Sequence, residues 1–315
     1  TARFSPPAFT IDYKDQIGAG AFGEVYGGLL TESLTPICVK VSRDRRDDSF
    51  EKEFDLLVKL RGHGSIITTF GYTESQSLRY IVLEKAEGSL EHLLSFPRHS
   101  AGLPMHTTLR LTRDLGRALK SLYEQNIAHR DIKPGNILYF KDADSKELGE
   151  QFKFKLCDFG CGRAVASPEE SIQSLKGTLP YMAPQMVARY VGLFVSVNAA
   201  KADLWSLGVT LFRCCTGKFP FFSPNPREHL KILQERPVNS IFFNNSEKKY
   251  YDGITCYQNS VWLNLPMGRL IQMLFQQSNY EMMYEEMLNL SVLCPRIVYF
   301  VNDNKFYEAK PRFTM

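Results

Sequence analysis

Residues 129–136, His-Arg-Asp-Ile-Lys-Pro-Gly-Asn, contain the densest group of side chains in this chain that could carry chemistry. Asp131 could accept or orient the proton of a substrate hydroxyl, and Lys133 could offset charge on a transferred phosphoryl group. Asn136 and Asp158 offer hard oxygen atoms, which Mg²⁺ prefers together with substrate phosphates. A lone aspartate is usually a solvated loop charge, but these residues occur together and in order, with an alternating strand pattern just ahead of Asp158. The group therefore predicts phosphoryl transfer.

A glycine-rich segment, residues 17–25, lies upstream between two β-inclined stretches. Glycines let backbone N–H groups approach phosphate oxygens without a Cβ in the way. Taken alone, the pattern fits a simple hairpin turn equally well. A dinucleotide-binding fold would need a helix after the glycines, whereas Val25 continues a strand. The residues expected at the phosphates are Ile17, Gly18, Gly20 and Gly23.

Lys40 ends an apolar run that resembles the Val-Ala-Ile-Lys strand of protein kinases, with Cys38 in place of the alanine. A lysine in such a strand is costly unless it is paired. The resemblance implies the nucleotide phosphates and a helical glutamate as its partners. Glu53 fits best because leucines follow it at helical spacing, and Glu51 is the alternative. The competing interpretation of Lys40 is a solubility residue on an edge strand.

The amino-acid composition narrows the classes of protein to which this chain could belong. The 315 residues include 44% apolar and 23% charged residues, as in ordinary globular proteins, and the net charge of +4 is too small to indicate nucleic acid or a membrane surface. No apolar run approaches the roughly 20 residues of a membrane span. The seven cysteines are an odd number without a Cys-x-x-Cys pair, and the first residues lack an apolar signal core. We expect reduced thiols and a cytoplasmic location, with the nucleus as the alternative.

The order of predicted elements changes along the chain. Residues 1–84 predict strands at 11–18, 24–30, 36–41, 66–72 and 79–83, interrupted by a helix at 49–60. After residue 88 the pattern predicts helices at 107–126, 200–215 and 265–275, with irregular loops at 141–147 and 238–264. A β-rich part followed by an α-rich part indicates an α+β protein of two lobes, with the cleft between them as the ligand site.

Nearly the whole chain, from residue 11 to about 295, resembles the protein kinase superfamily. Besides the motifs above, residues 177–185 resemble the substrate-docking segment, and residues 203–208 the buried helix whose Asp203 braces the catalytic loop. The resemblance implies ATP and Mg²⁺ as cofactors and protein substrates. It also implies a two-lobe kinase fold with a small β-rich N-lobe with one main helix at 1–84, a hinge at 85–88 and a large α-helical C-lobe at 89–315.

The resemblance also implies an adenine site at the hinge. Leu83 would be the gatekeeper, and the backbones of Glu84 and Ala86 would hydrogen-bond the base. Plain core packing would explain the apolar members equally well. The side chains expected on the two faces of the ring are Val25, Cys38 and Leu138.

Within kinases the chain is most similar to the IκB-kinase-related branch, the TANK-binding-kinase and IKK-epsilon group. The similarity rests on the catalytic loop, on the Ser-x-x-Gly-Thr spacing from Ser174 to Thr178, and on the sequence at 216–221. It implies activation by phosphorylation of Ser174, with Arg130 receiving the phosphate, and signalling of the innate-immune or stress type. Lys133 and Thr178 favour Ser/Thr over Tyr as acceptor. Dimer or adaptor contacts would lie in family regions that these residues do not include.

Two alternatives remain open from the sequence. One is a pseudokinase that binds nucleotide as a scaffold, although Lys40, Asp131, Asn136 and Asp158 are all present. The other is a small-molecule phosphotransferase of the same fold, although the docking segment favours protein substrates. One departure from the family pattern is Gln185, which stands where a structural glutamate is usual and is remote from the chemistry.

Overall fold

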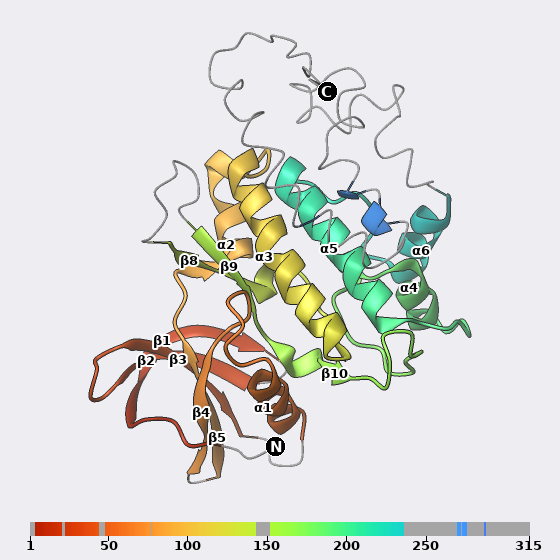
Figure 1. Cartoon of the computed structure of the whole chain (residues 1–315). Helices are drawn as coiled ribbons and strands as arrows, with labels where there is room; N and C mark the ends of the chain where they lie inside the picture. Colours follow the sequence, from red (N-terminus) through yellow and green to blue (C-terminus); the bar gives the residue numbers. More distant parts are fainter. Residues whose placement is uncertain are drawn as a thin grey trace, which may run out of the picture.

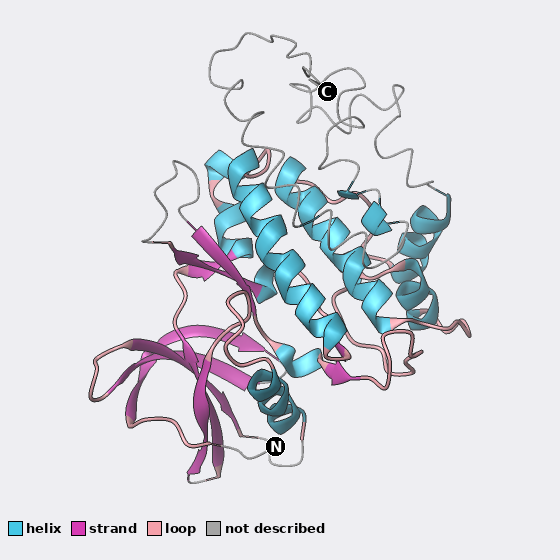
Figure 2. Ribbon diagram, viewed as in Figure 1, coloured by secondary structure: helices cyan, strands magenta, loops and turns pink. Residues whose placement is uncertain are grey.

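The computed structural model describes residues 4–20, 23–43, 48–75, 77–142, 152–235, 270, 271, 273–275 and 287. Within these residues a strand-rich lobe adjoins a helical lobe, with the strands at the lower left of Figures 1 and 2. This confirms the predicted α+β, two-lobe architecture, while the residue boundaries of the lobes stay a prediction. No helix in the described part of the chain has the length and apolar character needed to cross a membrane.

The strand-rich lobe is built on a five-stranded antiparallel sheet in the order β1-β2-β3-β5-β4. Side chains alternate between the two faces of a strand. Ile37, Val39 and Val41 therefore fill a small core on one face, which leaves Cys38 and Lys40 on the other. The strands are β1 (Phe9–Gly20), β2 (Gly23–Leu30), β3 (Pro36–Ser42), β4 (Thr69–Ser75) and β5 (Leu78–Glu84).

Helix α1 (Ser49–Lys59) is the main helix of this lobe. Phe50, Phe54 and Leu57 recur at helical spacing and are almost completely buried, so this face joins the main hydrophobic core. No side chain caps its N-terminus. The position of α1 therefore depends on what packs against its sides.

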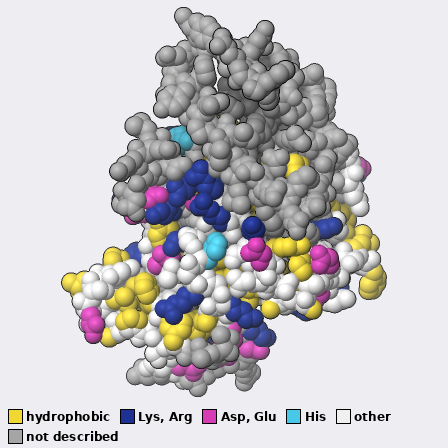
Figure 3. All heavy atoms as spheres, viewed as in Figure 1, with side chains coloured by type: hydrophobic (Ala, Val, Ile, Leu, Met, Phe, Trp, Pro, Cys, Tyr) yellow, Lys and Arg dark blue, Asp and Glu magenta, His cyan; other side chains and the backbone are white. Residues whose placement is uncertain are grey.

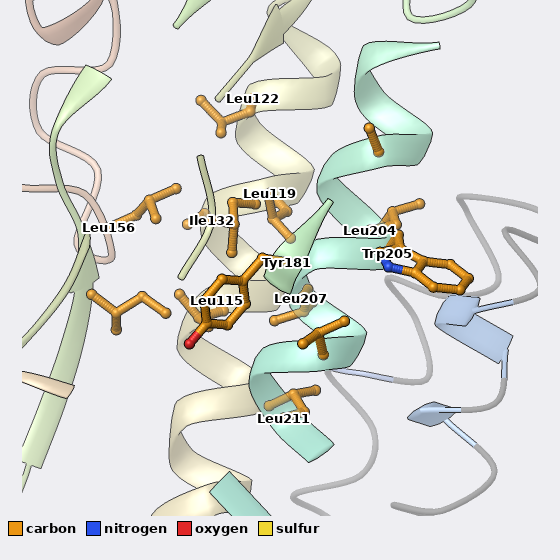
Figure 4. Close-up of a cluster of buried hydrophobic side chains, with 14 of the residues drawn as sticks. Leu115, Leu119, Leu122, Ile132, Leu156, Tyr181, Leu204, Trp205, Leu207 and Leu211 are labelled. Atoms are coloured by element: carbon orange, nitrogen blue, oxygen red, sulfur yellow. The ribbon is translucent and has the colours of Figure 1, made fainter. Parts of the chain in front are cut away.

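The helical lobe is organised around α3 and α5, which run side by side in Figure 1. Figure 4 shows the leucines of both helices pointing into one core. Asn198 caps α5 by accepting a hydrogen bond from the Lys201 N–H at 2.8 Å. The helices are α2 (Leu90–Ser95), α3 (Met105–Glu124), α4 (Pro184–Tyr190), α5 (Ala199–Thr216) and α6 (Pro226–Glu235).

The remaining elements are short strands and single 3₁₀ turns. One small sheet has the order β6-β8-β9, and a two-stranded sheet joins β7 to β10. The strands are β6 (Gly88–Ser89), β7 (Ile127–Ala128), β8 (Ile137–Lys141), β9 (Phe152–Leu156) and β10 (Arg163–Ala164). The 3₁₀ turns are η1 (Pro97–His99), η2 (Pro134–Asn136), η3 (Phe159–Cys161) and η4 (Leu179–Tyr181).

One predicted strand, 66–72, is shifted in the structure. Strand β4 begins only at Thr69. Leu156 of β9 donates to the Ser65 carbonyl, and its own carbonyl accepts from the Ile67 N–H, both at 2.9 Å. The apolar residues before Thr69 thus pair with the helical lobe instead of the sheet, which the alternation pattern could not reveal.

The other predicted elements agree to within a few residues. Residues 270, 271 and 273–275 are helical, as predicted for 265–275. The predicted loop at 238–264 and most of the one at 141–147 lie outside the described residues. On the face drawn in Figure 3, basic and acidic side chains are interspersed with apolar ones, in line with the small net charge.

Candidate active site

Lys40 connects the two lobes by contacting two carboxylates. Its Nζ atom lies 2.7 Å from Glu53 Oε2 on α1 and 2.8 Å from Asp158 Oδ1 in the helical lobe. Burial by itself lowers the pKa of Lys40, but the two carboxylates outweigh it and raise the pKa above its usual value. Lys40 therefore stays cationic although only 7% of it is exposed.

The structure distinguishes between the two glutamates considered for Lys40. Glu53 lies on the buried face of α1, between Phe50 and Leu57, and is 2% exposed. Glu51 points elsewhere, with Oε1 3.6 Å from Arg79 Nη1 and 3.5 Å from the Tyr72 hydroxyl. The helical pair of Lys40 is thus Glu53.

Asp203 of α5 holds the start of the loop that carries Asp131. Its two carboxylate oxygens accept hydrogen bonds from the backbone N–H groups of His129 and Arg130, each at 2.7 Å. Arg130 adopts a positive φ of 68°, which is uncommon for a residue with a side chain. Hydrogen bonds to a charged acceptor are strong, and Asp203 is 4% exposed. This arrangement fixes the backbone on which Asp131 sits.

Polar contacts orient the Asp131 carboxylate. Asn136 Nδ2 donates to Asp131 Oδ2 at 3.0 Å, and the Thr178 hydroxyl donates to Asp131 Oδ1 at 2.8 Å. Lys133 Nζ lies 2.8 Å from Asp131 Oδ2 and donates to Thr178 Oγ1 at 2.8 Å. Two segments far apart in sequence, 131–136 and 177–178, thus meet at one carboxylate.

Asp158 is presented by a tight turn, with a φ of 59°. The next residue, Phe159, is buried, and its ring centroid lies 4.8 Å from that of His129. His129 Nε2 also lies within hydrogen-bond distance, 2.9 Å, of the Cys157 carbonyl. The sequence alone indicates no role for His129, but through these contacts it joins the Asp131 loop to the Asp158 turn. Burial raises the pKa of Asp158, but nearby Lys40 outweighs it and leaves the pKa below its usual value.

Arg130 reaches the activation-segment residue that the sequence singled out. Its Nη1 donates to Ser174 Oγ at 2.7 Å, and its Nε donates to the Cys161 carbonyl at 2.6 Å. Ser174 is exposed. The second contact holds the guanidinium in place from the turn just after Asp158.

The glycines of the β1–β2 hairpin differ in what they require. A Cβ on Gly23 would lie 2.4 Å from the Val41 carbonyl oxygen, and its φ is +131°, so the chain itself demands glycine there. At Gly18 and Gly20 a Cβ would meet no atom within 4 Å. The protein leaves open space at these two positions, which suits the close approach of a ligand. Ile17 beside them is 48% exposed.

The residues expected around adenine lie on the partly exposed side of otherwise buried strands. Cys38 is half-buried between Ile37 and Val39, which are both 0% exposed. Burial raises the pKa of Cys38 to about 11, so the thiol is neutral and acts as an apolar surface. Val25, Leu83 and Leu138 are likewise only partly buried.

The side chain of Glu84 makes contacts that the sequence did not indicate. Its Oε1 accepts hydrogen bonds from the Thr68 N–H at 2.7 Å and from Lys155 Nζ of β9 at 2.6 Å. Ala86 follows in the connection between β5 and β6. The side chain of Glu84 therefore ties the end of β5 to the helical lobe, next to the predicted hinge. No local pattern could have revealed a partner 71 residues away.

Comparison with known proteins agrees with this geometry. Residues 11–289 match the protein kinase domain family. The chain is 32% identical over 235 residues to the epsilon subunit homolog 1 of inhibitor of nuclear factor kappa-B kinase from Caenorhabditis elegans, covering 68% of this chain and 28% of that protein. It is 32% identical over 241 residues to the mouse kinase subunit epsilon, covering 72% of this chain and 33% of that protein.

A third relative, human serine/threonine-protein kinase ULK1, is 30% identical over 236 residues, covering 72% of this chain and 21% of that protein. The chain thus spans about a third or less of the length of these relatives. Their names include IκB-kinase-related proteins and another Ser/Thr kinase at nearly the same identity. On its domain match, its two-lobe fold and its relatives, the chain belongs to the protein kinase family.

Proposed function

We propose that this chain is a protein Ser/Thr kinase that uses ATP and Mg²⁺ and transfers the γ-phosphoryl group to hydroxyls of protein substrates. The proposal rests on two groups of contacts that lie next to each other. Lys40 pairs with Glu53 and Asp158. Asn136 orients Asp131, and its backbone carbonyl accepts a hydrogen bond at 3.0 Å from the N–H of Cys157, the residue before Asp158. A structural ion pair would explain Lys40 alone. A structural ion pair would not explain why the carboxylate of Asp131 is also held in one orientation by the amide of Asn136.

ATP fits the chain at two places. The open space at Gly18 and Gly20 leaves room for phosphates, and the cationic Lys40 offers them a partner. The base would lie between the partly exposed side chains of Val25, Cys38 and Leu138.

The donor set near Lys40 also fits magnesium. Asn136 uses its amide N–H group on Asp131, which leaves its amide oxygen available as a ligand. The Asn136 backbone carbonyl also accepts from the N–H of Cys157, next to Asp158, whose carboxylate would be the second ligand. Among the residues that the structure describes there is no cluster of three or more metal-binding His, Cys, Asp or Glu side chains. Magnesium in phosphotransferases needs only one or two protein oxygens plus phosphates. When bound, it would neutralise phosphate charge.

The protein groups then have separate tasks in the transfer. Asp131 accepts the proton of the substrate hydroxyl while the hydroxyl oxygen forms a bond to the γ-phosphorus. The bond between the γ-phosphorus and the oxygen that bridges it to the β-phosphate breaks at the same time, and ADP leaves. Lys133 offsets negative charge on the transferred group. Asn136 and Thr178 hold the carboxylate in one orientation, so that catalysis rests on positioning and charge.

Regulation by phosphorylation of Ser174 forms part of the proposal. Arg130 is already in contact with this exposed hydroxyl, and a phosphate there would add charge-assisted bonds to the guanidinium. Because Arg130 also donates to the Cys161 carbonyl, a guanidinium held by the phosphate would also hold the turn after Asp158 in place. Ser174→Ala should leave ATP binding intact and lower activity. Equal activity of phosphorylated and fully dephosphorylated wild type would contradict this part.

The branch and the setting are also proposals. The names of three relatives support the IκB-kinase-related branch. The proposed innate-immune or stress-type signalling in the cytoplasm, with the nucleus as the alternative, follows from the resemblance to that branch. Dimer or adaptor contacts would be made by regions of those longer relatives outside the matched part.

A transfer assay tests the central proposal. Purified chain is incubated with labelled ATP, Mg²⁺ and a generic protein, and label in the protein is compared for wild type, Asp131→Ala and Asp158→Ala. Asp48→Asn, on the exposed start of α1, is the matched control. Label that is no higher for wild type than for the two site variants would support the pseudokinase scaffold instead. Transfer to small molecules but not to peptides would support the small-molecule phosphotransferase.

A further inference from the structure

The segment before β1, residues 4–8, runs along the outer edge of β4. The Tyr72 N–H donates to the Phe4 carbonyl at 3.0 Å, and the Thr31 N–H donates to the Ala8 carbonyl at 2.8 Å. Strand β4 is the last strand of the sheet, and such an edge presents backbone groups that pair readily with an added segment. The segment is therefore fixed at both ends.

Strand β4 is shaped to receive this segment. A Cβ on Gly71 would lie 2.4 Å from the Pro6 nitrogen and 2.8 Å from the Ser5 carbonyl carbon. Gly71 also has a φ of +143° and lies at a register shift between β4 and β5. Only glycine allows the two backbones to come this close.

The side chain of Phe4 reaches the helix that carries Glu53. Its ring centroid lies 5.6 Å from that of Phe54 on α1, and the Arg61 guanidinium carbon lies 4.3 Å from the ring centre. Phe54 is 0% exposed and directly follows Glu53. It also contacts Tyr72 of β4, with 5.4 Å between centroids. Phe4 thus bridges the edge strand and α1.

The opposite side of α1 faces the turn that follows Asp158. A Cβ on Gly162 would lie 2.7 Å from Leu56 Cδ1, which shows how closely that turn packs on the helix. The helix is therefore held between the catalytic turn and the Phe4 segment. The Asp48 side chain makes no capping hydrogen bond at the start of α1, and these two contacts act on the sides of the helix together with the Lys40–Glu53 pair.

We propose that the surface formed by Phe54, Tyr72, Gly71 and Arg61 is a docking site for an aromatic side chain on an extended peptide, and that Phe4 of the same chain occupies it. Occupancy positions α1 so that Glu53 meets Lys40. Phe4 is a positioning residue, because it acts through α1 and touches neither substrate nor nucleotide. Only the catalytic part of the test rests on the proposed kinase function.

Four variants test the docking site. Phe4→Ala removes the ring, and Gly71→Ala displaces the backbone while Phe4 stays. Phe4→Tyr keeps the ring and should behave like wild type. Phe9→Ala is the matched control, since it removes an aromatic contact between the first residue of β1 and Tyr80, in the separate small core. Should Phe4→Ala fail to fold, Phe4→Leu replaces it.

Hydrogen exchange of the α1 amides is measured by mass spectrometry, together with kcat and the KM for ATP. Phe4→Ala and Gly71→Ala should each speed α1 exchange by on the order of tenfold, in line with losing an aromatic and a cation contact. They should lower kcat by a similar factor and change KM less.

Exchange and kcat of Phe4→Ala and Gly71→Ala that match the Phe9→Ala control would overturn the inference. If wild type shows no transfer at all while α1 exchange still responds to Phe4, the docking site stands and the proposed kinase function fails. The two ideas therefore fail separately.

Discussion

Replacement of Asp203 by Asn tests whether this carboxylate braces the catalytic loop. Its two oxygens each accept a backbone N–H at 2.7 Å, from His129 and Arg130. Asparagine keeps one acceptor oxygen and turns an N–H group toward the other backbone donor. One charge-assisted hydrogen bond, worth about 1.5–3 kcal/mol, is lost, and a buried donor is left unsatisfied. Because the two effects overlap, we expect the free energy of unfolding to fall by about 2–4 kcal/mol.

Urea titration followed by tryptophan fluorescence measures this change, because Trp205 lies in α5 and is 4% exposed. The matched control is Asp48→Asn, whose carboxylate is exposed and pairs with Lys52, and which should leave the unfolding midpoint unchanged. We also expect Asp203→Asn to lower phosphoryl transfer at temperatures where it remains folded, because the backbone of Asp131 is no longer fixed. An unfolding free energy of Asp203→Asn within about 0.5 kcal/mol of wild type would refute the reasoning.

Three further predictions concern single residues. Gly23→Ala should destabilise the fold by at least about 1 kcal/mol, because the positive φ of Gly23 and the nearby Val41 carbonyl both disfavour a Cβ. Gly20→Ala should leave stability unchanged and weaken ATP binding, because a Cβ there meets no protein atom. Chemical denaturation measures the stability of both variants and nucleotide titration their ATP affinity, and a Gly23→Ala variant as stable as wild type would contradict the prediction for Gly23. Cys38, with its pKa raised to about 11, should react with iodoacetamide at pH 7.5 roughly 100-fold more slowly than an unperturbed thiol, and labelling at the rate of free cysteine would disprove its burial. The pKa of Asp158 is lowered in the fold, so its ion pair stabilises the fold at pH values above the unfolded pKa of about 3.9, and this stabilisation is lost as the pH falls through the folded pKa. Denaturation at each pH should therefore give a difference in unfolding free energy between wild type and Asp158→Asn that is constant between about pH 5 and 8 and shrinks below about pH 4. A difference that widens below about pH 4 would refute this prediction.

Local patterns were sufficient to predict most elements of the strand-rich lobe. Apolar spacing in α1 identifies the buried face, and Glu53 lies on that face while Glu51 does not. The same reasoning explains why Lys40 and Cys38 share one side of β3. Properties set by the period of one helix or strand are therefore readable from the sequence.

Contacts between distant segments were not readable. Glu84 and Lys155, and Phe4 and Phe54, meet only because the fold brings their strands and helix together. The misplaced start of β4 has the same origin, since the partner of Ile67 lies in β9. The Arg130–Ser174 contact and the bracing of the catalytic loop by Asp203 are exceptions, because a resemblance to known kinases supplied both in advance of the geometry.

The hydrogen bonds between residues 65–67 and Leu156 restrict how the two lobes can move. The lobes are joined covalently between β5 and β6 and a second time by this backbone pairing. Two backbone attachments define an axis, so the lobes can rotate about the line between them while both attachments persist and the Lys40–Asp158 ion pair opens. Glu84, held by Lys155 next to that line, would move little in such a rotation. If the chain binds ATP as proposed, nucleotide exchange would then move the β1–β2 hairpin, while the connection between β5 and β6 would stay in place.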